Sequence, residues 1–198
     1  AVPAALHRLR RALAVAAASA CCFVAAGSAS AGDLQPCGDV AERDQMLALL
    51  NALRQQGGSC AAGPAPPLLW DARLAASASA HAADLADRDE LSHVDSRRRT
   101  LAKRLLDADY GYRIATENLV SGALGFEHAL AVWRASDKHC ANLMHPEVRD
   151  VGVACTVRAG VAGGPASQVW VANFAAPLTA QPLLRAGRAT LVAGARAD

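Results

Sequence analysis

Apolar residues recur three or four positions apart in several segments of the chain, as the buried face of a helix requires. Asp39 and Glu42 form a capping box at the start of the first segment, and Asp71 is placed to cap the second. The third is expected to start at Asp95 or Ser96, with three arginines in its first turn. The pattern predicts helices over 39–57, 71–91, 95–106 and 125–136.

In three further segments, β-branched residues alternate with other residues, a two-residue repeat that is typical of a β-strand. It predicts a short strand at 111–115 and two longer strands at 151–155 and 169–174. The loop that joins the last two is rich in glycine, so we predict that they form an antiparallel hairpin. Helices around a small sheet of this kind predict an α+β sandwich rather than a doubly wound fold.

The N-terminal segment has the organisation of a secretory signal peptide. Basic residues at 7–11 precede an apolar run at 12–26, and small residues at 29–31 form a cleavage site. We therefore predict a signal peptide over 1–31 and export to the periplasm or out of the cell. Cys21 offers the alternative of a lipoprotein signal, which is weaker because no large aliphatic residue stands three positions before it. No later apolar run is long enough for a transmembrane helix.

The composition suits one globular domain. The 198 residues carry a formal net charge of +2, and 53% of them are hydrophobic, which is enough for a core. A charge so close to neutral gives no reason to expect nucleic acid or an anionic membrane as a partner. We expect a monomer.

The use of cysteine agrees with an exported protein. Of six cysteines, loss of two with the signal peptide leaves four, an even number: Cys37, Cys60, Cys140 and Cys155. Four cysteines allow three pairings, and proximity along the chain favours Cys37–Cys60 with Cys140–Cys155. No C-x-x-C spacing is present, so we favour disulfides over a zinc–thiolate site.

Four polar residues follow the ends of predicted elements and are candidates for one cavity: His93, Glu117, Ser136 and His139. Two imidazoles and a carboxylate suit a divalent metal such as zinc, with water in the remaining position, so His93 and His139 are the candidate metal ligands. The same residues also suit a structural network in which Glu117 orients His139 through a charge-assisted hydrogen bond. The sequence leaves both interpretations open.

Three other residues allow both a structural and a functional interpretation. His81 shares the apolar stripe of its helix, so we predict a core-facing histidine with a polar partner rather than a ligand. His145 precedes a proline, where an exposed turn residue is expected more often than an extra ligand. Cys140 beside His139 suggests a nucleophile, which we disfavour because adjacent side chains point apart and Cys140 is expected in a disulfide.

Five short motifs follow one another along the chain. They are Trp70-Asp71 before an alanine-rich helix, Leu91-Ser92-His93, Glu117-Asn118-Leu119, a run with Trp133, Ser136, His139 and Asn142 at three-residue spacing, and Val151-Gly152-Val153. Each motif is weak alone, but the ordered set resembles the CAP superfamily of cysteine-rich secretory proteins, antigen 5, plant pathogenesis-related proteins and bacterial SCP-like proteins.

The resemblance implies an α-β-α sandwich, with a small antiparallel sheet flanked by helices and a large cleft. It divides the chain into a signal peptide (1–31), an N-terminal lead-in (32–43), a CAP domain (44–176) and a C-terminal tail (177–198). The family's cavity carries two histidines and two acidic residues, and His93, Glu117 and His139 match three of these. Ser136 stands where many members have glutamate, which implies a more weakly held metal.

The resemblance implies binding rather than catalysis, because the family lacks a generally accepted reaction. Some members bind zinc through the paired histidines, and others bind sterols or fatty acids. We therefore expect a non-catalytic module that holds a divalent cation, a small apolar ligand, a lipid or a cell-envelope component. The alternative is a metal-dependent, peptidase-like hydrolase with Glu117 as general base, although neither H-E-x-x-H nor G-x-S-x-G occurs.

Overall fold

The computed structural model of the protein describes residues 34–37, 40–57, 63–122, 125–158 and 166–178. The predicted signal peptide, the candidate lipidation site Cys21, the cap Asp39, Cys60 and the predicted tail after Leu178 lie outside these residues. The division into signal peptide, lead-in, domain and tail therefore stays a prediction. Within the described ranges, none of the helices combines the length and the apolar character needed to cross a bilayer.

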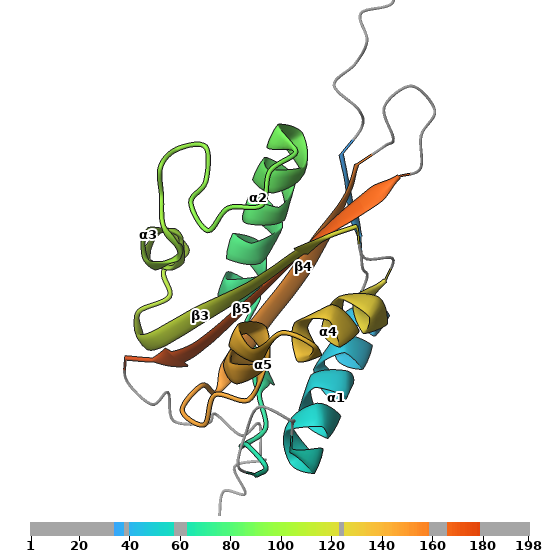
Figure 1. The fold of residues 1–198 in the computed structure, drawn as a ribbon. Helices are drawn as coiled ribbons and strands as arrows, with labels where there is room; N and C mark the ends of the chain where they lie inside the picture. Colours follow the sequence, from blue (N-terminus) through green and yellow to red (C-terminus); the bar gives the residue numbers. More distant parts are fainter. Residues whose placement is uncertain (1–33, 38–39, 58–62, 123–124, 159–165, 179–198) are drawn as a thin grey trace, which may run out of the picture. The chain divides into compact units, whose positions relative to one another are not determined.

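Helices and strands are interspersed along the described chain (Figure 1). Their order is β1 (Gln35–Cys37), α1 (Val40–Gln56), β2 (Leu69–Trp70), α2 (Ala72–Arg88), α3 (Leu101–Asp107), β3 (Tyr112–Ser121), α4 (Phe126–Arg134), α5 (Asp137–Leu143), β4 (Asp150–Arg158) and β5 (Ser167–Pro177). The strands form one sheet in the order β1-β4-β5-β3, with β2 pairing parallel to β4. The other pairings are antiparallel, which confirms the predicted hairpin of β4 and β5.

Helices cover both faces of the sheet because successive side chains of a strand point to opposite sides. On β5, one set of alternate residues packs against α2 and α3, namely Val169, Val171 and Ala175. The other set packs into the core that includes residues of α1, α4 and α5, namely Trp170, Ala172 and Phe174. This layering confirms the α-β-α sandwich expected from the sequence.

The second predicted helix starts where its cap signal places it. The side chain of Asp71 accepts hydrogen bonds from the backbone N–H groups of Arg73 and Leu74, at 2.8 and 3.3 Å. The helix ends at Arg88, three residues before the expected end, because Asp89 takes a left-handed conformation with φ 53°.

The third helix starts later than predicted. The buried carboxylate of Asp95 accepts hydrogen bonds from the backbone N–H groups of Arg97 and Arg99, at 3.0 and 2.8 Å, and pairs with the Arg99 guanidinium. These bonds hold a turn in which Arg98 has φ 63°. The three arginines therefore precede α3 instead of forming its first turn, and the helix begins only at Leu101.

Two elements around the candidate site differ from the prediction. The strand expected at 111–115 continues as β3 to Ser121, so Glu117 lies within it rather than after it. His139 lies on α5, a seven-residue helix that the sequence pattern did not predict because its exposed side is polar and its apolar positions are few.

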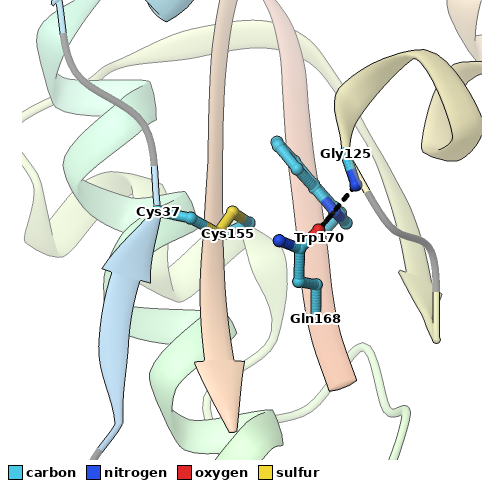
Figure 2. Close-up of a disulfide and its surroundings, with 5 residues drawn as sticks. All are labelled: Cys37, Gly125, Cys155, Gln168 and Trp170. Carbon is cyan, nitrogen blue, oxygen red and sulfur yellow. Dashed lines mark hydrogen bonds between the residues drawn. A yellow bond between two sulfur atoms is a disulfide. The ribbon is translucent and has the colours of Figure 1, made fainter. Parts of the chain in front are cut away.

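The described disulfide joins Cys37 to Cys155, so the pairing favoured by proximity is wrong for both of these residues. The two cysteines are direct partners on neighbouring strands β1 and β4, with Cα atoms 5.2 Å apart (Figure 2). They are 118 residues apart in the sequence, and the sheet brings them together. Cys140 is also disulfide-bonded, but not to Cys155.

Disulfide mapping checks this connectivity. A non-reducing digest of the purified protein is expected to give a peptide pair that contains Cys37 and Cys155. In a scheme of four paired cysteines, the second pair then contains Cys60 and Cys140. Recovery of a Cys37–Cys60 pair would contradict the strand pairing of β1 with β4.

Candidate functional site

The centre of the candidate site is Glu117, whose side chain points from β3 toward the layer of α2 and α3. Its side chain is only 2% exposed. His93 Nδ1 lies 2.8 Å from Glu117 Oε1. Arg104 Nη2 lies 2.9 Å from Oε2 and 3.1 Å from Oε1, so this one nitrogen reaches both carboxylate oxygens. The carboxylate is therefore held by an imidazole and a guanidinium together.

Arg104 is a site residue that the sequence interpretation missed. It is 4% exposed on α3, and besides binding Glu117 it donates a hydrogen bond to the His93 carbonyl at 3.2 Å. A buried charge needs a partner of opposite sign, and Glu117 supplies it. The sequence does contain a signal for this role. Arg104 lies in the apolar stripe of its helix, next to Leu105 and one turn after Leu101, and a cation at such a position has to be buried.

His93 lies in the loop after α2, and 61% of its side chain is exposed. Because a carboxylate only accepts, Nδ1–H donates to Glu117 and the lone pair stays on Nε2. The hydrogen bond to Glu117, and then the negative charge of Glu117, raise the pKa of His93. A carboxylate that fixes the tautomer and orientation of a histidine is the arrangement found behind metal-binding imidazoles.

His81 is buried against the same carboxylate, as predicted for a core-facing histidine with a polar partner. Its Nε2 lies 2.8 Å from the Ser92 carbonyl and 4.0 Å from Glu117 Oε1. Burial lowers the pKa of His81. Its contact with Ser92 fixes the backbone immediately before His93.

His139 approaches the site from α5, on the other face of the sheet. Asn118 donates to the His139 carbonyl at 3.0 Å, and Asn142 donates to the Asn118 side chain at 2.8 Å and to the Glu117 carbonyl at 3.3 Å. These bonds attach α5 to β3. Burial, and then the charge of His93, lower the pKa of His139.

The bond between Glu117 and His139 that the structural-network interpretation required is absent from the described hydrogen bonds, because Glu117 binds His93 instead. His139 Nδ1 is buried and has no hydrogen-bond partner among the described residues.

Ser136 and His145 have structural positions. Ser136 is the N-cap residue of α5, and its carbonyl accepts from the Cys140 N–H at 2.8 Å. His145 Nδ1 accepts from the Glu147 N–H at 3.2 Å in the turn after α5. Neither residue lines the pocket described next.

A solvent-accessible pocket of about 400 Å³ lies between β3, α3 and α5. His93, Glu117 and Asn142 line it, together with residues of β3 and of the start of α3. The described residues include no cluster of three or more His, Cys, Asp or Glu side chains arranged to hold a metal ion. Of the four predicted cavity residues, His93 and Glu117 line this pocket, whereas His139 and Ser136 do not.

Comparison with known proteins agrees with the fold and the order of the motifs. A family model described as the cysteine-rich secretory protein family, CAP, matches residues 47–174, which is more than half of the chain. No curated protein matches the sequence significantly.

Two solved structures resemble the fold. One is an extracellular protein containing an SCP domain from Bacillus anthracis, with 25% identity and a TM-score of 0.56 over 69% of this chain. The chain spans only 40% of the length of that protein. The other is an outer surface protein of Borrelia burgdorferi, with 16% identity and a TM-score of 0.56 over 72% of this chain and 98% of its own.

Proposed function

The chain belongs to the CAP family, and we propose that it is an exported, non-catalytic binding module that holds a divalent cation such as zinc between His93 and His139. Export is supported by the signal-peptide pattern, by the disulfide between Cys37 and Cys155, and by the extracellular relative from Bacillus anthracis.

The hydrogen bond from His93 to Glu117 is the observation that carries this proposal. It leaves the His93 Nε2 lone pair for a ligand, on a side chain that is mostly exposed at a solvent-accessible pocket. His139 supplies a second imidazole whose pKa is lowered, so it is neutral and able to coordinate at pH 7. Two protein ligands leave the remaining coordination positions to water, which favours weak and reversible binding.

The hydrolase alternative finds less support. A general base must present a lone pair to a water molecule in the pocket. Both oxygens of Glu117 accept from Arg104, one of them also accepts from His93, and the side chain is only 2% exposed. The carboxylate is thus engaged in orienting His93, which suits a binding site better than a catalytic one.

Calorimetric titration with zinc tests the proposal. The wild type is expected to bind, and His93→Ala and His139→Ala to lose binding. Glu117→Gln is expected to bind about 10- to 100-fold more weakly, because the orientation of His93 is lost. His128→Ala changes an exposed histidine on α4 and is the matched control. Equal heats from the wild type, His93→Ala and His139→Ala would exclude the cation site.

A further inference from the structure

Strand β3 is an edge of the sheet, since β5 is the one strand with which it pairs among the described residues. The backbone of an antiparallel strand presents the N–H and C=O of alternate residues to the same side. The Glu117 carbonyl accepts from Asn142 and the Leu119 carbonyl accepts from Trp133 Nε1 at 3.1 Å, so these residues face away from β5. Ala115 lies two positions earlier and faces the same way.

The edge is covered at one end and open at the other. Side chains of α4 and α5 donate hydrogen bonds to the carbonyls of Leu119 and Glu117, respectively. No hydrogen bond between described residues uses the N–H or C=O of Ala115, or the N–H of Glu117. An unpaired row of this kind on an edge strand is a template for another extended chain.

The open part of this edge lies in the pocket of about 400 Å³, which Ala115 and Glu117 both line. Thr100, Leu101 and Ala102 line it at the start of α3, and Asn142 lines it from α5. The two helices pack on opposite faces of the sheet, so the edge is recessed between them.

Two arginines lie in the loop at the rim of the pocket. The loop before α3 supplies Val94 and Thr100 to the lining, and the exposed residues Arg97 and Arg98 lie between them. The neighbouring carboxylate of Asp95 is paired with Arg99. The guanidinium groups of Arg97 and Arg98 make no ion pair among the described residues, so they are available to an acidic partner.

We propose that this pocket binds an extended acidic peptide segment of a partner protein, which adds as a short strand beside Ala115 and Glu117. Peptide carbonyls accept from the N–H groups of Ala115 and Glu117, a peptide N–H donates to the Ala115 carbonyl, and peptide carboxylates meet Arg97 and Arg98. A lipid offers no row of donors and acceptors to match this edge. The inference rests on the proposed binding role of the pocket, but it does not require the cation.

The test uses a fluorescent peptide of about eight residues in which aspartate and valine alternate, because alternate side chains of a bound strand face the same wall. Ala115→Pro removes the outward N–H and is compatible with an edge strand, so it is expected to weaken binding at least about tenfold. A probe methylated on alternate backbone nitrogens makes the same test from the ligand side, should the proline variant fail to fold.

The contribution of the two arginines is tested with the double variant Arg97→Ala/Arg98→Ala, which is expected to bind the peptide more weakly and with a smaller dependence on salt. Arg134→Ala, an exposed arginine on α4, is the matched control. Ala115→Pro is expected to bind zinc as the wild type does, and His139→Ala, which changes a residue outside the pocket lining, to bind the peptide, which separates this proposal from the cation site.

Three results would overturn the inference. One is the absence of probe binding below about 1 mM. Another is equal binding by Ala115→Pro or by the methylated probe. The third is binding of anionic lipid vesicles that depends on Arg97 and Arg98 but not on Ala115, which would assign the rim to a membrane surface instead.

Discussion

Gly152→Ala is expected to destabilise the fold by about 3 kcal/mol or more, the upper range for overpacking a core. Gly152 lies on β4 where α2 crosses the sheet. An added Cβ would stand 2.0 Å from the backbone nitrogen of Ala75 and 2.3 Å from the carbonyl carbon of Leu74. Both atoms belong to the helix backbone, so no side chain can rotate away, and the whole helix must move. Asn173 also donates to the Leu74 carbonyl at 3.2 Å, and this bond is strained by the same movement.

Chemical denaturation of the purified protein measures this effect, and Gly63→Ala is the matched control. A Cβ at Gly63 meets nothing within 4 Å, and the backbone there is not left-handed, so we expect a change within about 0.5 kcal/mol. An unchanged midpoint for Gly152→Ala would show that α2 does not rest on β4 at this distance.

Arg54→Met is expected to cost about 3–5 kcal/mol, because it removes a buried charge that several carbonyls surround. Arg54 on α1 is 0% exposed. Its guanidinium donates to the carbonyls of Pro66 at 2.6 Å, Leu143 at 2.5 Å and His145 at 3.2 Å. Burial, and then the charge of Arg149, lower the pKa of Arg54 to about 10, so it stays charged at neutral pH.

Methionine keeps most of the volume of Arg54 but leaves these carbonyls without donors. They belong to the segment before β2, to the last residue of α5 and to the turn that follows it, so these segments are expected to loosen. Arg43→Met is the control on the same helix. Among the described residues, Arg43 forms an ion pair with its exposed neighbour Asp44 alone, so the change in stability should be less than about 0.5 kcal/mol. Equal midpoints for the two variants would contradict the role given to Arg54.

Features that depend on short stretches of sequence were predictable. The start of α2 follows from Asp71, whose side chain needs only the next turn of backbone to act as a cap. The hairpin of β4 and β5 follows from alternation and a glycine-rich connection. In both cases the interacting groups are close together in the chain, so the local pattern contains the information.

Features that depend on which strands are neighbours were not predictable in this way. The partner of Cys37 depends on β1 lying beside β4, and nothing in the sequence near Cys37 records that. Likewise, the close approach at Gly152 has only a general signal, since a glycine inside a strand often marks a place where another backbone comes near. The sequence shows the glycine but not that α2 is the neighbour.

The partners of Glu117 in the candidate site could not be predicted from the local sequence either. One of the two interpretations left open by the sequence had Glu117 orienting His139, but Glu117 binds His93 and Arg104. The reason is the alternation of β3, which points Glu117 toward α2 and α3 and points Asn118 toward α5. Once Glu117 is inside the strand, rather than after it, its partners must come from the first of these layers.

The bond between Cys37 and Cys155 also governs what happens to a nicked molecule. A protease that cuts one peptide bond anywhere between the two half-cystines leaves both fragments covalently joined. Nicked protein therefore migrates as a single species until a thiol reductant separates the pieces. Outside the cell, such damage would not by itself release a fragment from the sheet.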